Sequence, residues 1–220
     1  MNYKRVVLLA GHYGSGKTNI AVNIALELRS RFDRVAIADL DIVNPYFRTK
    51  DSEAELKAAG ILLISSAFAG SNMDLPALPQ EAYSITDDRT LRAVMDIGGD
   101  DRGALALGRY TPFLRAEDDY EMLFVINKYR PLTRDPESAA QILHEVETAG
   151  GLPFTAIVNN SNLGEETAPK DVLASQAYAD AVTALTGLPV KMTTVKAPLV
   201  PALRGKIENL YPLTLQKKIK

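Results

Sequence analysis

The chain contains no cysteine among its 220 residues. This absence excludes disulfide bonds, thiolate zinc sites and cysteine-ligated iron–sulfur clusters within the chain. No apolar run approaches 18 residues, so we expect no transmembrane helix. The formal net charge is only −2, which gives no general attraction to nucleic acid or to anionic lipid. The short, lysine-containing segment 210–220 is too weakly patterned for firm membrane binding. We therefore expect no nucleic-acid partner and no stable membrane anchor.

The hydrophobic content, 46% of the residues, is enough to bury one sizeable core, and it favours a single domain over residues 1–220. Short apolar runs alternate with helical patterns, which predicts an α/β fold: a doubly wound, mostly parallel sheet with helices on both faces. The predicted strands are 5–10, 34–39, 60–65, 92–97, 120–127, 154–159 and 189–195. The predicted helices are 17–31, 51–59, 101–116, 134–149 and 168–186.

The first apolar run, residues 6–10, leads directly into a glycine-rich loop. A signal peptide would continue into a cleavage region instead, so we interpret this run as a strand and expect a cytoplasmic protein.

The loop reads Gly11-His-Tyr-Gly-Ser-Gly-Lys-Thr18 and fits the phosphate-binding pattern G-x-x-x-x-G-K-[ST] at every fixed position. Backbone N–H groups of such a loop surround a polyphosphate, and glycines let the chain turn and approach closely. Lys17 would lie near the β- and γ-phosphates, and the hydroxyl of Thr18 would ligate Mg²⁺. The predicted nucleotide-binding residues of this segment are Gly11, Gly14, Ser15, Gly16, Lys17, Thr18 and Asn19.

Ligands of doubly wound sheets bind beyond the carboxyl ends of the strands. The second predicted strand ends in Asp39-Leu-Asp41 and the fourth in Asp96-Ile-Gly-Gly. A carboxylate held by a stiff strand suits a magnesium site or the polarisation of an attacking water. The sixth strand ends at Asn159, whose amide suits the edge of a purine base, and the backbone near Pro198 could flank that base.

In this order, the motifs resemble those of the MinD/ParA and cobyrinic-acid-synthase group of P-loop nucleotide-binding proteins. The resemblance covers nearly the whole chain and also includes Asn127-Lys-Tyr-Arg-Pro131. It implies hydrolysis of ATP with Mg²⁺ as cofactor. Lys17 and Asp41 would then be catalytic, Asp41 by acting on the water. Thr18, Asp39 and Asp96 would serve the metal, and Asn159 the base.

Many members of that group have a lysine directly after the first glycine, which reaches the nucleotide of a partner subunit. Here this residue is His12, whose mostly neutral imidazole cannot supply a permanent charge. The sequence therefore leaves the oligomeric state open, with a homodimer as one alternative.

Three functions remain open. The first is an ATPase switch that acts on an unidentified protein partner through the loops 40–50 and 97–103. The second is an enzyme that phosphorylates or activates a small anionic substrate held by Arg48, Arg102 and Arg109. The third is a module that binds nucleotide without hydrolysing it.

Overall fold

The computed structural model describes residues 1–40, 52–65, 83–98 and 106–215. Its centre is an eight-stranded sheet with the order β3-β2-β4-β1-β5-β6-β7-β8, in which each neighbouring pair is parallel. This arrangement confirms the predicted α/β fold with a doubly wound parallel sheet. The strands are β1 (Val6–Ala10), β2 (Val35–Leu40), β3 (Leu62–Ser65), β4 (Arg92–Ile97), β5 (Tyr120–Ile126), β6 (Ala156–Asn159), β7 (Val190–Lys196) and β8 (Leu210–Leu213).

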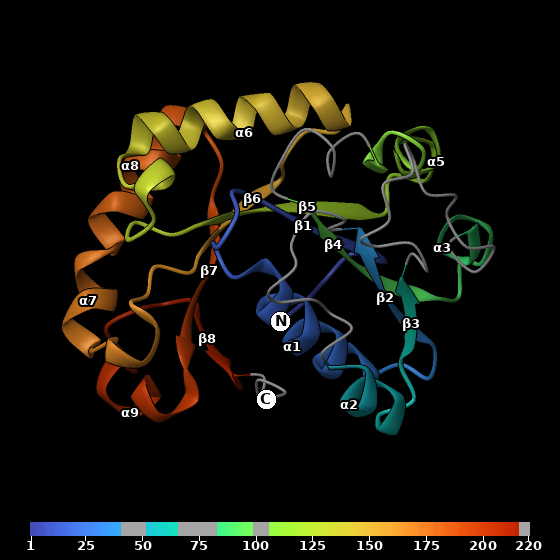
Figure 1. Ribbon diagram of the computed structural model, residues 1–220, viewed down its shortest axis with the longest axis horizontal. Helices are drawn as coiled ribbons and strands as arrows, with labels where there is room; N and C mark the ends of the chain where they lie inside the picture. The colour runs from blue at the N-terminus through green and yellow to red at the C-terminus, as the bar shows by residue number, and fades with distance from the viewer. Residues whose placement is uncertain (41–51, 66–82, 99–105, 216–220) are drawn as a thin grey trace, which may run out of the picture.

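The central strands β1, β2 and β5 are apolar almost throughout, because helices cover the sheet on both faces. One face packs against α1 (Lys17–Arg29) and α2 (Glu53–Ala58). The opposite face packs against α3 (Ser84–Asp87), α5 (Thr111–Glu117), α6 (Pro136–Gly150) and α8 (Gln176–Thr186). Figure 1 shows α6 and α5 on one side of the sheet, and α1 and α2 on the other.

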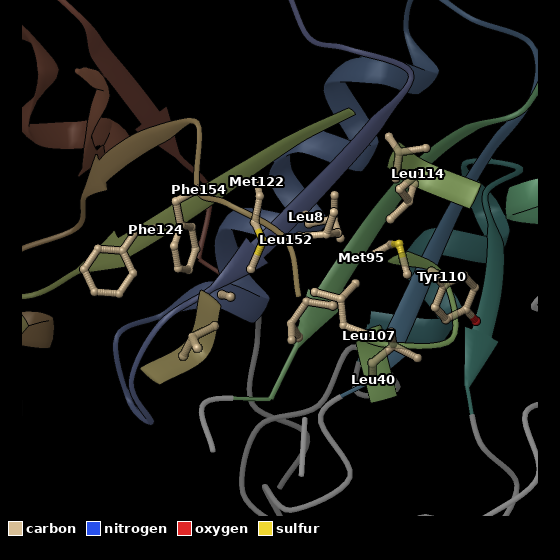
Figure 2. Packing of buried hydrophobic residues seen from close by; sticks show 14 of the residues in the cluster. Leu8, Leu40, Met95, Leu107, Tyr110, Leu114, Met122, Phe124, Leu152 and Phe154 are labelled. Carbon is tan, nitrogen blue, oxygen red and sulfur yellow. The ribbon is translucent and has the colours of Figure 1, made fainter. Parts of the chain in front are cut away.

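The second face carries the larger side chains. Figure 2 shows Leu8, Met95 and Met122 of neighbouring strands pointing into the same layer as Leu107, Tyr110 and Leu114. All six residues are at most 3% exposed. This buried apolar layer lies between the central strands and the helices of that face, as in other closely packed protein interiors.

Helix ends follow the local chemistry expected from the sequence. Asp135 caps α6, since its side chain accepts a hydrogen bond from the backbone N–H of Ser138 at 2.8 Å. Gly151 and Gly187 end α6 and α8 in the left-handed conformation, with φ of 67° and 74°. The first residue of the predicted helix 51–59 lies outside the described residues, as does most of the loop 40–50.

Several elements differ from the sequence prediction. In its described part, the predicted helix 101–116 is interrupted by turns at 108–110, after which α5 begins, and the short helix α3 was not predicted. The predicted helix 168–186 is divided into α7 (Pro169–Ala174) and α8 at Ser175. The hydroxyl of Ser175 donates to the carbonyl of Val172 and accepts from the amide of buried Asn159, so this residue serves a tertiary contact. The strand β8, which the sequence analysis missed, pairs with β7 at the sheet edge.

The short helix α9 (Val200–Leu203) packs beside β8 and α7. The remaining elements are the single-turn helices η3 (Pro131–Thr133), η4 (Gly164–Glu166) and η5 (Ala197–Leu199). Of the helices in the described part of the chain, none is both long and apolar enough to cross a membrane.

Candidate nucleotide-binding site

The phosphate-binding motif forms a tight loop between the end of β1 and the first turn of α1. Gly11, Gly14 and Gly16 have φ values of 143°, 75° and 94°, a range that residues with a Cβ rarely adopt. A Cβ on Gly11 would lie 2.5 Å from the carbonyl oxygen of Val125, and one on Gly16 would collide with the amide nitrogen of Asn160. The glycines of the motif are therefore required by the backbone geometry of this loop.

Lys17 and Ser15 lie within the loop and are almost completely buried. The ammonium of Lys17 donates to the carbonyl oxygen of Gly11 at 2.9 Å, and the N–H of Ser15 donates to the carbonyl of His12 at 3.2 Å. Within the described residues, the buried hydroxyl of Ser15 has no hydrogen-bond partner. The loop therefore presents buried polar groups and one ammonium at a helix N-terminus, which fits an anionic polyphosphate.

The two described aspartates of the predicted metal site are brought together. Asp39 of β2 and Asp96 of β4 are register partners on adjacent parallel strands, and both are buried. Their strand neighbours Ile37 and Val94 face α1, so alternation places both carboxylates on the α1 face of the sheet. Thr18, in the first turn of α1, covers the same face.

These three side chains suit Mg²⁺, which takes oxygen ligands and usually binds through one or two carboxylates together with phosphate oxygens. No group of three or more histidine, aspartate or glutamate side chains in the described chain could hold a metal ion alone. The Thr18 hydroxyl and the phosphate oxygens of a bound nucleotide would supply further oxygen ligands of the kind that Mg²⁺ takes. Asp41, the predicted catalytic carboxylate, lies outside the described residues.

A pocket continues from the side of the loop toward the carboxyl ends of β6 and β7. Its wall combines loop backbone, amide and hydroxyl side chains, and several apolar side chains. The lining residues are Gly14, Ser15, Gly16, Asn19, Arg130, Asn160, Asn162, Gly164, Thr167, Val172, Thr194, Val195, Lys196, Leu213 and Leu215. It thus includes four of the predicted nucleotide-binding residues and lies directly beside the phosphate loop.

The structure places Asn160, and not Asn159, on this wall. The amide of Asn160 donates to the carbonyl of Ser15 at 2.6 Å, and its oxygen accepts from the hydroxyl of Thr194 at 2.5 Å. It therefore fastens the phosphate loop to β7. Asn159 points into the interior, where its amide donates to Ser175 and its oxygen accepts from the hydroxyl of Ser161 at 2.7 Å. The base contact that we predicted for Asn159 stays a prediction.

The last predicted residue, Pro198, lies in η5 and is exposed, whereas the neighbouring wall of the pocket is formed by residues 194–196. His12 is half-buried, and one of its ring nitrogens lies 3.0 Å from the carbonyl of Tyr13. Of the arginines predicted to hold a small anion, Arg109 is exposed, and Arg48 and Arg102 lie outside the described residues.

Three residues of the pocket wall were not predicted from the sequence as site residues: Arg130, Asn160 and Thr194. A signal for Asn160 was present, because it is the second residue of an Asn-Asn pair and the strand ends at the first. Arg130 belongs to the segment Asn127–Pro131 that was noted in the sequence, but that segment gave it no role. Thr194 carries no local motif, and the pairing of β5, β6 and β7 brings both residues to the loop.

No family model and no curated protein matches this chain. Several solved structures do match its fold. FtsY from Mycoplasma mycoides is 18% identical with a TM-score of 0.57, and the match covers 86% of this chain and 59% of that one. Chloroplast FtsY from Physcomitrella patens is 15% identical with a TM-score of 0.58, covering 88% of this chain and 59% of that one.

The 54 kDa signal recognition particle protein from Aeropyrum pernix, solved with GDP, is 16% identical with a TM-score of 0.52. That match covers 87% of this chain and 41% of the other. The chain therefore has the P-loop NTPase fold of these proteins and spans about half of their length. At this level of identity the likeness describes the fold, and the finer MinD/ParA grouping stays a prediction.

Proposed function

We propose that this protein binds a purine nucleoside triphosphate with Mg²⁺, hydrolyses it slowly, and acts as a nucleotide-controlled switch on a protein partner. The observation that carries the proposal is the loop Gly11–Thr18, with its positive-φ glycines and buried Lys17, on a sheet that pairs the buried Asp39 and Asp96. A bound Mg²⁺ would neutralise charge on the phosphates, held by the Thr18 hydroxyl and by a shell that includes the two aspartates.

In this proposal each part of the site has a separate role in binding or hydrolysis. Backbone N–H groups of the loop bind phosphate oxygens, and the ammonium of Lys17 moves from the Gly11 carbonyl to the phosphates. In this proposal Asp41, two residues beyond Asp39, orients the attacking water. Gly98, two residues after Asp96, is the first residue beyond β4, and in this proposal it lets the backbone respond to the terminal phosphate.

We favour ATP over GTP on the composition of the pocket wall. Guanine presents two neighbouring N–H donors, which a carboxylate accepts best, and adenine does not. The described lining residues include amides, hydroxyls and aliphatic side chains, but no carboxylate. The GDP in the Aeropyrum pernix structure makes GTP the competing candidate.

The proposal is tested with purified protein, Mg²⁺ and either ATP or GTP. Lys17→Ala should lower affinity for the triphosphate at least tenfold and abolish turnover, because it removes the ammonium from the loop. Asp41→Ala should retain affinity and lose turnover. Calorimetry and phosphate release measure the two quantities separately. Undiminished turnover by Lys17→Ala, in protein free of contaminating ATPase, would refute the proposal.

A further inference from the structure

The segment after β5 presents Arg130 in a fixed backbone conformation. The N–H of Arg130 donates to the carbonyl of Asn127 at 3.0 Å, and its own carbonyl accepts from the N–H of Thr133 at 3.1 Å. The side-chain oxygen of Asn127, which is fully buried, accepts from the N–H groups of Tyr129 and Asn162. These hydrogen bonds join the loop to both β5 and the segment that follows β6. The backbone of Arg130 is therefore held in place.

The side chain of Arg130 extends across the phosphate loop at Gly14. Its Nε, Cδ and Cζ atoms lie 3.6 to 3.8 Å from the position that a Cβ on Gly14 would occupy. Arg130 also shares the pocket wall with Gly14, Ser15, Gly16 and Asn19. A guanidinium therefore lies against the side of the loop that opens into the nucleoside pocket.

Within the described residues, this guanidinium makes no hydrogen bond or ion pair. Its neighbours in sequence differ in this respect: Lys128 donates to the carbonyl of Ala174, and Arg134 lies 3.8 Å from the carboxylate of Asp135. An arginine with five donors, a backbone held in place and no local acceptor is suited to binding an anion in a bidentate manner.

We propose that Arg130 binds the α- and β-phosphates of the nucleotide held by its own chain. This inference rests on the proposed nucleotide-binding function and adds a residue to it. Gly14, Ser15 and Gly16 are shared by the loop and the pocket, so the part of the ligand that passes from loop to nucleoside lies beside Arg130. Gly14 has no side chain, and the guanidinium approaches the loop backbone there without obstruction.

The test compares Arg130→Ala with Arg134→Ala by calorimetry, using Mg²⁺-ATP, Mg²⁺-ADP and adenosine as ligands. Both variants remove one positive charge from exposed positions four residues apart, so long-range charge effects cancel. We expect Arg130→Ala to weaken ATP and ADP binding by about tenfold each, since one charge-assisted contact is lost. Arg134→Ala should change neither by more than about twofold, and adenosine affinity should be the same in both variants.

A further variant, Arg130→Lys, should recover part of the loss, because it keeps the charge but not the bidentate geometry. Equal affinities of Arg130→Ala and Arg134→Ala would overturn the inference. A loss confined to ATP would overturn the assignment to the α- and β-phosphates. The wild-type affinity tests the proposed function separately: a wild-type chain that binds no triphosphate refutes both proposals, whereas one that binds normally and is insensitive to Arg130→Ala refutes only this one.

Discussion

Individual residues of the site differ in how clearly the sequence predicts them. Gly11, Gly14, Gly16 and Lys17 follow from the motif, because a fixed spacing of glycines is needed for a loop with positive φ. An asparagine at the end of β6 was also predictable, but its side-chain direction was not. Asn159 points into the interior, whereas its neighbour Asn160 points toward the pocket. Which of the two faces the pocket depends on where β6 ends, and tertiary packing decides that.

Asn160 should be the more sensitive of the two asparagines in a binding assay. Asn160→Ala removes the hydrogen bonds to Ser15 and Thr194, and we expect it to lower the free energy of unfolding by about 1 to 3 kcal/mol and to weaken nucleotide binding. Asn159→Ala should cost a similar amount of stability, with little effect on the affinity of the folded protein. Urea unfolding and calorimetry measure the two effects. A larger loss of affinity in Asn159→Ala would support its predicted base contact instead.

Secondary-structure elements were predicted well where the chain is strongly patterned. The buried strands β1, β4 and β5 begin and end within about one residue of the expected positions, because both faces are covered and the apolar runs are continuous. β8 was missed because it is short, contains Pro212 and lies at the sheet edge, where an apolar run is not needed. The break at Ser175 depends on Asn159, far away in sequence, and no local pattern signals it.

The α6 helix offers a pH test at the scale of one element. The N–H of Ser138 bonds to Asp135 and holds the pKa of that carboxyl below its usual value near 4. A depressed pKa stabilises the folded state above the unfolded pKa, and this stability is lost as the pH falls through the lowered value. Asp135→Asn keeps a capping acceptor but does not titrate, so it should lose less stability between pH 6 and pH 3 than the wild type. Identical acid dependence of the two proteins in urea unfolding would contradict this cap.

At the scale of the whole molecule, the N-terminus and the strand β8 both contact α1. Glu27 of α1 accepts hydrogen bonds from the N-terminal ammonium at 2.8 Å and from the hydroxyl of Tyr211 in β8 at 3.0 Å. Burial alone raises the pKa of Glu27, but these hydrogen bonds outweigh it and the pKa is lowered. Because α1 starts at the loop Gly11–Thr18, β8 contacts the same helix that begins at this loop.

The same strand supplies part of the pocket wall, so folding of the sheet edge and nucleotide binding should be coupled. Leu213 of β8 is buried against the α1 face and lines the pocket, whereas Leu143 of α6 is equally buried on the opposite face. Leu213→Ala and Leu143→Ala should each lower the free energy of unfolding by about 2 to 4 kcal/mol. Only Leu213→Ala should also weaken Mg²⁺-ATP binding, measured well below the melting temperature of both variants so that both are folded. If both variants bind the nucleotide with wild-type affinity, β8 closes the sheet without contributing to the pocket.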